Sequence, residues 1–309
     1  MSEVLEQLAR VLGERAKRDE PLAPYTSMRV GGPADLLVAC RTADEVVRTA
    51  RQAQAHGVPW LVLGSGCNVL VADAGVRGLV ILNRAEQVRL ADDGTVWAET
   101  GAQMAALSRQ AVERGLGGLE WAAGLPGTVG GAVVGNAGAF GGDVATNLVS
   151  AQVLPRDGAA AERPGAWFDF VYRGSRIKAL PTHERPVVLA ATFQLRPGDP
   201  QALRAQAAEI VTWRRTRHPS GATMGSTFKN APDAHAGRVI EGAGLKGYRI
   251  GGVKVSEQHA NFFVNTGEAT AADVLALMRH VQDIVERQFG IRLEPEVELV
   301  GAWGLPNEK

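Results

Sequence analysis

The sequence has 309 residues, 45% of them hydrophobic, and its 33 basic residues balance its 33 acidic residues. This length and apolar content allow a sizeable core and predict two or three domains. A net charge of zero gives no sign of a nucleic-acid partner or a membrane surface. The two cysteines, Cys40 and Cys67, form neither a disulfide framework nor a zinc site, and they indicate free thiols in a reducing compartment.

The N-terminal segment 2–18 differs from a signal peptide because its charges are mixed. Its apolar residues follow a helical spacing instead, and these are Val4, Leu5, Leu8, Val11 and Leu12. No apolar run in the chain approaches the length that spans a membrane. We therefore expect a cytoplasmic protein.

Residues 1–87 are predicted to form a small α/β subdomain. Residues 35–39 favour a strand, and a capping box at 42–45 opens a helix that ends near Gly57. Further strands are expected at 60–63, 69–71 and 79–82, with a turn of small residues at 64–68. This order of strand, helix and strands is typical of an α/β unit.

Residues 88–197 are predicted to form a second α/β subdomain. A strand at 95–100 and an amphipathic helix at 103–114 precede the segment 115–142, which holds eleven glycines in 28 residues. Apolar residues such as Trp121 and Val133 interrupt this segment. We interpret it as packed chain lying close against a ligand, with a flexible loop as the alternative. An apolar strand at 187–195 closes the subdomain.

A third part is predicted at 198–309, after a boundary at Pro197-Gly198. A helix is expected at 201–215, a strand at 261–264, and a second helix at 271–289 that Thr270 caps. The fold class is therefore predicted to be α+β, with two α/β subdomains followed by a C-terminal α+β domain.

Two glycine-rich segments are candidates for holding a phosphate ligand. The turn Gly64–Asn68 lies between two strands, and its successive backbone N–H groups can form an anion-binding nest for a pyrophosphate. It is not the dinucleotide fingerprint, because no helix is expected after it and the glycine spacing differs. Together with the segment 118–142, the turn can hold an extended dinucleotide from both sides. Ordinary turns are the alternative.

The two segments together resemble the FAD-binding half of flavoproteins of the vanillyl-alcohol oxidase type. More narrowly, the chain resembles the UDP-N-acetylenolpyruvoylglucosamine reductases, also called UDP-N-acetylmuramate dehydrogenases. Further motifs carry this resemblance: YRGS at 172–175, GSTFKN at 225–230, LKGYRIGG at 245–252, HANF at 259–262 and LEPEV at 293–297. The resemblance covers nearly the whole chain from about Tyr25 onward.

The resemblance implies FAD as the cofactor and NADPH as the electron donor. A thioether between Cys67 and the flavin is an alternative, but the place of Cys67 in a turn suited to anion binding favours non-covalent FAD. NADPH reduces FAD and leaves, and the enolpyruvyl group of a UDP-sugar then takes a hydride at its vinyl carbon and a proton at the neighbouring carbon. The implied reaction converts UDP-N-acetylglucosamine enolpyruvate to UDP-N-acetylmuramate, a step of peptidoglycan synthesis. The implied partner is the UDP-sugar, with neither a nucleic acid nor a membrane.

The resemblance also assigns three catalytic residues. Arg173 would stabilise the enolate, because its charge is permanent and its planar fork suits a carboxylate. Ser226 would donate the proton, and Glu296 would polarise or orient the group at the enolate. Taken outside the motifs, these residues would be an ordinary surface arginine, a capping serine and a strand-edge glutamate.

Cofactor and substrate contacts follow from the matched motifs in the same way. The expected cofactor-binding residues are Gly64, Ser65, Gly66, Cys67, Asn68, Gly124, Pro126, Gly127, Thr128, Gly130, Gly131, Asn136 and Gly138. The expected substrate-binding residues are Tyr172, Arg217, Lys229, Asn230, Lys246 and His259. For His259, a half-buried structural role is an equal alternative.

The chain departs from the family pattern at several positions. Cys67 replaces the usual Ser of the turn, Phe140 replaces a common Tyr, and no Tyr lies between Arg173 and Ser226. The missing Tyr indicates the subclass that lacks a Tyr-bearing loop over its substrate. Two other functions stay open: a sugar or alcohol oxidase of the same flavin superfamily, which would reduce oxygen rapidly, and a non-catalytic nucleotide-binding module.

Overall fold

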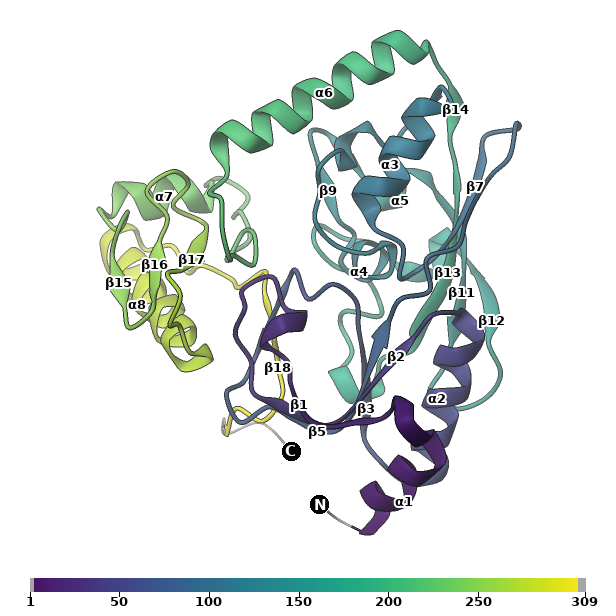
Figure 1. The fold of residues 1–309 in the computed structure, drawn as a ribbon. Helices are drawn as coiled ribbons and strands as arrows, with labels where there is room; N and C mark the ends of the chain where they lie inside the picture. Colours follow the sequence, from purple (N-terminus) through teal and green to yellow (C-terminus); the bar gives the residue numbers. More distant parts are fainter. Residues whose placement is uncertain (1–2, 305–309) are drawn as a thin grey trace. The chain divides into compact units, whose positions relative to one another are not determined.

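The computed structural model describes residues 3–304 as a mixed α and β chain (Figure 1). The chain divides into two compact units. Unit 1 consists of Met1–Lys17, Leu36–Ser65 and Gly78–Arg214, and unit 2 of Arg18–Asp35, Gly66–Arg77 and Arg215–Lys309. The sequence instead predicts three continuous domains, at 1–87, 88–197 and 198–309. This division into domains stays a prediction.

The first sheet has the strand order β1-β2-β5-β3, formed by β1 (Lys17–Pro21), β2 (Pro33–Cys40), β5 (Val76–Asn83) and β3 (Trp60–Leu63). Helix α2 (Ala43–Ala55) joins β2 to β3, which pairs in parallel with β5. The helix begins where predicted, because the Thr42 side chain accepts a hydrogen bond from the Glu45 backbone. Helix α1 (Glu3–Leu12) packs against α2, and both contribute to a buried apolar cluster of unit 1.

The second sheet is antiparallel and lies in unit 1, with the order β12-β11-β13-β7-β6. Its strands are β6 (Val88–Leu90), β7 (Thr95–Glu99), β11 (Leu148–Leu154), β12 (Ala161–Pro164) and β13 (Val187–Gln194). In the register, Ala191 of β13 lies between Ala98 of β7 and Ala151 of β11. Helix α3 (Met104–Glu113) buries its apolar face in the larger core cluster of this unit.

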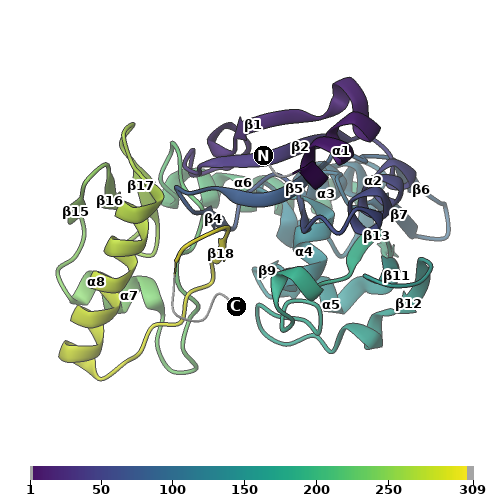
Figure 2. The same cartoon turned by 90° about the horizontal axis from the view of Figure 1, so that it is seen from below.

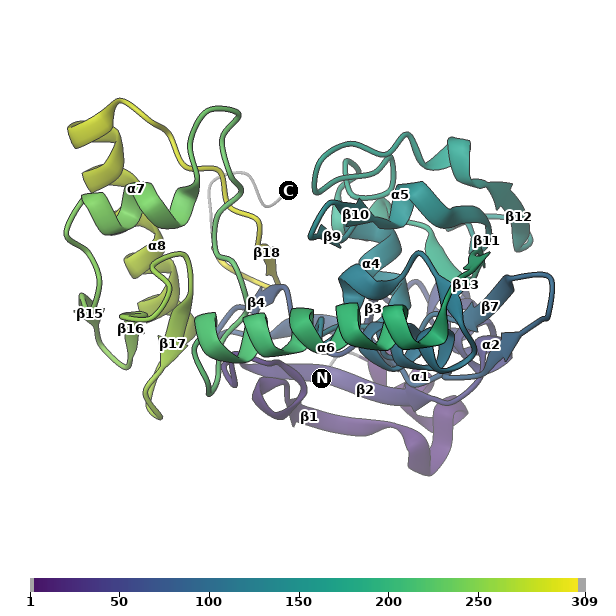
Figure 3. The same cartoon turned by 90° about the horizontal axis from the view of Figure 1, so that it is seen from above.

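The glycine-rich segment 115–142 is folded chain rather than a flexible loop. It contains β8 (Leu116–Gly117), α4 (Val129–Gly135), β9 (Gly138–Ala139) and β10 (Gly142–Asp143), and α5 (Val144–Asn147) follows it (Figure 3). Helix α4 forms despite its three glycines, because Thr128 caps it and Val129, Ala132 and Val133 are buried against the core. It packs against β13 and β7.

The predicted boundary at Pro197-Gly198 remains attached to unit 1. Strand β14 (Arg196–Pro197) pairs with β8, and the Gly198 N–H donates to the Gly115 carbonyl. Helix α6 (Pro200–Arg217) begins directly afterwards, which confirms the predicted helix at 201–215. The division between the two units falls inside this helix, between Arg214 and Arg215.

Unit 2 contains a small antiparallel sheet, β15 (Arg249–Ile250), β16 (Val253–Val255) and β17 (Phe263–Asn265), with α7 (Ala236–Gly242) and α8 (Ala271–Phe289) beside it (Figure 2). The bounds of α8 are as predicted. The strand predicted at 261–264 is wrong in its start, because the Phe262 N–H turns back to the His259 carbonyl and pairing begins at Phe263.

Unit 2 also includes strands from distant parts of the chain. Strand β4 (Val69–Val71) pairs in parallel with β18 (Glu298–Val300), with Val69 opposite Glu298. Met28, Val30 and Leu70 are buried in the same apolar cluster as the inner face of α8. Among the described residues, no helix is long and apolar enough to cross a membrane.

Candidate functional site

The two glycine-rich segments meet inside unit 1. A Cβ placed on Gly64 would lie 2.5 Å from Thr128 Oγ1, so the end of β3 touches the N-cap of α4. A side chain at position 64 would separate the two segments. This contact supports the expectation that both segments hold one ligand.

Gly66 adopts a conformation that favours glycine within the predicted pyrophosphate turn. Its φ is +63°, and an added Cβ would lie 2.3 Å from the Tyr25 carbonyl oxygen. The Ser27 N–H and hydroxyl both donate to the Gly66 carbonyl, at 3.1 and 3.3 Å. The turn is thereby fixed against residues 25–27, which belong to the same unit.

The predicted cofactor residues of the second segment surround α4. In chain order they occupy the loop before the helix, its N-cap, its first turn, its C-cap and β9: Gly124, Pro126 and Gly127; Thr128; Gly130 and Gly131; Asn136; Gly138. A Cβ placed on Gly127 would have no atom within 4 Å. The backbone at Gly127, directly before the N-cap Thr128 that lies against Gly64, therefore borders open space, which suits close approach of a dinucleotide such as FAD.

Arg173 lies at the tip of a tight hairpin in unit 1. Val171 and Gly174 exchange both backbone hydrogen bonds, each of 3.1 Å, which leaves Tyr172 and Arg173 as a two-residue loop. The φ of Arg173 is +55°, in the left-handed region that costs a non-glycine residue roughly 1–2 kcal/mol. Such strained conformations occur often at functional sites, where the surrounding structure enforces them.

Two side-chain hydrogen bonds tie the Arg173 hairpin to α4. The Asn136 side chain donates to the Val171 carbonyl at 3.0 Å and accepts from the Ala145 N–H at 3.1 Å. On the other side of the hairpin, the Ser175 hydroxyl donates to the Val134 carbonyl at 2.6 Å. The buried Asn136 side chain thus helps to hold the Arg173 hairpin beside the glycine-rich segment, and the predicted contact of Asn136 with the cofactor stays a prediction.

A second arginine shares the electrostatic environment of Arg173. Burial lowers the pKa of the Arg214 guanidinium, and the nearby charge of Arg173 lowers it further. Arg214 donates to the Trp121 carbonyl at 3.2 Å, and its guanidinium lies 5.3 Å from the ring centre of Phe140. Arg173 and Arg214 make this part of unit 1 a favourable environment for an anion.

In unit 2, backbone and side-chain hydrogen bonds connect the Ser226–Thr227 segment, Glu296 and Asn68 of the pyrophosphate turn. The Glu296 N–H donates to the Thr227 carbonyl at 2.9 Å, which places Glu296 beside the residue that follows Ser226. On the far side of Glu296, the Asn68 amide donates to the Glu296 carbonyl at 3.1 Å, and the Glu298 N–H donates to the Asn68 carbonyl at 3.1 Å. The structure therefore brings Asn68, Glu296 and the Ser226–Thr227 segment together through hydrogen bonds just before β4 and β18.

Comparisons with known proteins agree with this arrangement. A family model described as an FAD binding domain matches residues 34–162, and one described as the UDP-N-acetylenolpyruvoylglucosamine reductase C-terminal domain matches residues 217–300. The chain is 45% identical over 308 residues to UDP-N-acetylenolpyruvoylglucosamine reductase 2 of Symbiobacterium thermophilum, with 98% of each chain covered. This chain belongs to the UDP-N-acetylenolpyruvoylglucosamine reductase family. The Rubrobacter xylanophilus reductase is 46% identical over 290 residues, covering 93% of this chain and 95% of its own.

A solved member of the reductase family has the same fold. The crystal structure of UDP-N-acetylenolpyruvylglucosamine reductase from Thermus caldophilus superposes with a TM-score of 0.79 at 36% identity, covering 93% of this chain and 99% of its own. These comparisons confirm the predicted mixed α and β fold, with an FAD-binding domain and a C-terminal domain of the reductase family.

Several residues predicted to bind substrate form ion pairs or caps within unit 2. Lys229 pairs with Glu294, and Lys246 pairs with Glu241 at 2.6 Å. The Asn230 side chain accepts from the Ala236 N–H at 3.0 Å, at the start of α7. Arg217 is the exposed last residue of α6. In unit 1, Tyr172 is 54% exposed on the Arg173 hairpin. Their contacts with substrate stay predictions.

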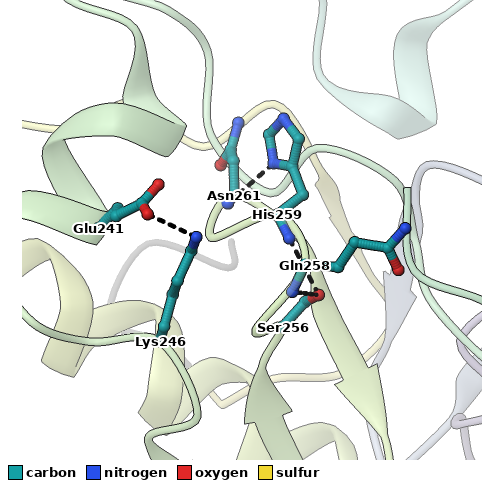
Figure 4. Close-up of polar contacts among 6 residues, drawn as sticks. All are labelled: Glu241, Lys246, Ser256, Gln258, His259 and Asn261. Carbon is teal, nitrogen blue, oxygen red and sulfur yellow. Dashed lines mark hydrogen bonds and ion pairs between the residues drawn. The ribbon is translucent and has the colours of Figure 1, made fainter. Parts of the chain in front are cut away.

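His259 lies in the loop between β16 and β17 (Figure 4). Burial lowers the pKa of His259, and the charge of nearby Lys246 acts in the same direction, against the opposing effects of a backbone hydrogen bond and of Glu241. The ring packs against Phe262 and His218, with ring centres 4.9 and 5.8 Å away. His259 is therefore half-buried, as the alternative of a structural role expected.

Three residues near the site were not predicted. Arg214 shares the surroundings of Arg173, Trp121 receives its hydrogen bond, and Asn261 contacts the segment that contains Ser226. Asn261 lies inside the HANF motif, so that motif was the available signal. No sequence motif indicated Arg214, because the residues it interacts with, Trp121 and Arg173, are far away in the sequence.

Proposed function

We propose that this chain catalyses the NADPH-dependent reduction of UDP-N-acetylglucosamine enolpyruvate to UDP-N-acetylmuramate, using non-covalently bound FAD, in the synthesis of peptidoglycan precursors. Family membership supports this reaction. The structural observation that carries it is the set of hydrogen bonds in unit 2 that connects Asn68 to Glu296, and Glu296 to Thr227 beside Ser226. These bonds join the predicted cofactor turn to two predicted catalytic residues.

The chain supplies positioning, charge and a proton to this reaction. The turn Gly64–Asn68 and the glycine-rich residues around α4 would hold FAD, which would supply hydride transfer between NADPH and the enolpyruvyl group. Arg173 stabilises the negative charge that develops on the enolate and its carboxylate, since it carries a permanent charge in an enforced conformation. The Ser226 hydroxyl donates the proton to the carbon that bears this charge, and Glu296 orients the reacting group.

The remaining assignments belong to the same proposal. The residues Tyr172, Arg217, Lys229, Asn230, Lys246 and His259 bind the UDP-sugar. Cys40 and Cys67 are not joined in a disulfide, which suits a reducing, cytoplasmic location. The protein acts on a small UDP-sugar without a nucleic acid.

Replacing Ser226 tests the proposed proton donor. Ser226→Ala should leave the reduction of FAD by NADPH nearly intact, because the hydroxyl acts only after hydride transfer to the sugar. Reoxidation by the enolpyruvyl sugar should slow by roughly a hundredfold or more, the usual contribution of a positioned proton donor. Anaerobic stopped-flow spectroscopy of the flavin measures both steps separately. Equal slowing of the two steps would contradict the role of Ser226.

A further inference from the structure

The Asn261 side chain is bonded to the protein segment that contains Ser226. Asn261 is only 3% exposed. Its Oδ1 accepts from the Phe228 N–H at 3.0 Å, and its Nδ2 donates to the Phe228 carbonyl at 2.8 Å. Its backbone carbonyl accepts from the Thr227 N–H at 2.8 Å. Asn261 thus satisfies three backbone groups in the two residues that follow Ser226.

The other backbone groups of this segment bond to the segment that contains Glu294 and Glu296. The Thr227 carbonyl accepts from the Glu296 N–H at 2.9 Å, and the Lys229 N–H donates to the Glu294 carbonyl at 2.8 Å. Both backbone groups of Thr227 are therefore used, one towards Asn261 and one towards Glu296. Leaving a buried backbone group without a hydrogen-bond partner is costly. The segment that contains Ser226 therefore cannot slide relative to Glu296 without breaking these bonds.

The loop that presents Asn261 is itself fixed by internal hydrogen bonds (Figure 4). The Ser256 N–H donates to the Phe262 carbonyl at 2.8 Å, and the Ser256 hydroxyl accepts from the backbones of Gln258 and His259 at 3.1 and 3.2 Å. The Asn261 N–H donates to His259 Nδ1 at 3.3 Å. This last bond requires an unprotonated Nδ1, which places the proton of the neutral ring on Nε2.

We propose that Asn261 is a positioning residue for the reduction, which holds the Ser226 proton donor in register with Glu296, and that the neutral ring of His259 holds Asn261 in place. The inference rests on the proposed role of Ser226. It gives the buried Asn261 side chain a role in positioning, beside the proposed catalytic roles of Arg173, Ser226 and Glu296. Asn261 acts through Ser226 and does not contact the reacting atoms.

Two substitutions test this role. Asn261→Asp keeps the acceptor for the Phe228 N–H but loses the donor to the Phe228 carbonyl, and Asn261→Ala removes both. In either variant, flavin reoxidation by UDP-N-acetylglucosamine enolpyruvate should slow roughly tenfold to a hundredfold, as expected for a misplaced catalytic group. FAD reduction by NADPH should remain within about twofold. The solvent deuterium isotope effect on reoxidation should increase, because proton delivery becomes the slow event.

Asn265→Ala is the matched control. Its side chain also bonds backbone groups of unit 2, donating to the Met28 carbonyl and accepting from the Gly267 and Ala269 N–H groups, but none of these lies in the Ser226 segment. This variant should lose stability and keep the wild-type isotope effect. The same rise in the isotope effect for Asn265→Ala and Asn261→Asp would overturn the proposal.

A double variant separates this inference from the proposed function. Ser226→Ala with Asn261→Asp should reoxidise no more slowly than Ser226→Ala alone, since the amide acts through the hydroxyl. Independent, multiplicative effects would contradict the positioning role. If Ser226→Ala is as fast as wild type, the proposed role of Ser226 fails. If Ser226→Ala is slow and both Asn261 variants are fast, only the inference fails.

Discussion

At the scale of single residues, the conformation of Arg173 connects stability with function. A left-handed φ of +55° on an arginine is costly, and it is maintained by the hairpin bonds of Val171 and Gly174 and by the anchors from α4. The guanidinium is thereby held in one region of unit 1, close enough to Arg214 to affect its pKa. Preorganised charge of this kind stabilises a developing enolate without reorganisation during the reaction.

Arg173→Gly should therefore fold more stably than Arg173→Ala. Glycine accepts a positive φ without strain and alanine does not, so the free energy of unfolding should differ by about 1 kcal/mol in favour of glycine. Both variants lack the cation and should reoxidise the flavin with the enolpyruvyl sugar far more slowly than wild type. Urea denaturation measures the difference, and equal stability of the two variants would show that the residue carries no backbone strain.

At the scale of secondary-structure elements, the N-terminus of α8 is capped from two parts of unit 2. Thr270 and Asp273 form a capping box, and the Asp73 carboxylate accepts from the Ala271 and Ala272 N–H groups at 2.8 and 2.9 Å. The Asp273 carboxylate also accepts from the Gly252 N–H at 3.2 Å. These bonds satisfy the otherwise unpaired N–H groups of the first helical turn.

Asp273→Ala should lower the free energy of unfolding at pH 7 by about 1 kcal/mol, the usual effect of losing a cap. The Thr270 N–H in particular holds the pKa of Asp273 below its ordinary value of 3.8. A depressed carboxylate pKa stabilises the fold above the ordinary pKa, and this contribution is lost as the pH falls through the lowered value. The difference from wild type should therefore shrink as the pH falls below 3.8 and through the lowered pKa of Asp273. Asp283→Ala, an exposed position on the same helix, is the control and should change stability little.

The sequence was sufficient for elements whose ends depend on local interactions. Thr42 and Thr270 fixed the starts of α2 and α8, because a cap and its partner lie three residues apart. The sequence was insufficient for elements whose formation or ends depend on contacts with distant parts of the chain. Helix α4 forms in spite of its glycines through tertiary packing, and the start of β17 depends on a turn at His259.

The candidate site shows the same limit. The motifs predicted Asn68, Ser226 and Glu296, but the bond between Asn68 and Glu296 spans 228 positions and no local pattern encodes it. The clamp that Asn261 places on Phe228 spans 33 positions. The Asn136 side chain bonds backbone groups 35 and 9 positions away, and the motifs did not indicate these partners. Sequence motifs can indicate which residues are functional. Which distant residues they hydrogen-bond to depends on the fold.

At the scale of the whole molecule, unit 2 is assembled from three separate stretches of chain. Residues 18–35 and 66–77 contribute Met28, Val30 and Leu70 to its core and Asp73 to the cap of α8. The second stretch also begins with Gly66, Cys67 and Asn68, part of the predicted pyrophosphate turn. The same unit therefore carries part of the predicted cofactor site and two predicted catalytic residues.

The most direct test of the proposed function follows the flavin through one complete cycle. The purified yellow protein is reduced anaerobically with NADPH, excess NADPH is removed, and UDP-N-acetylglucosamine enolpyruvate is added. We expect the oxidised flavin spectrum to return at once, with one UDP-N-acetylmuramate formed per FAD. A reduced flavin that ignores the sugar and is reoxidised rapidly only by oxygen would contradict the account and indicate an oxidase, and a colourless protein would indicate a nucleotide-binding module without redox activity.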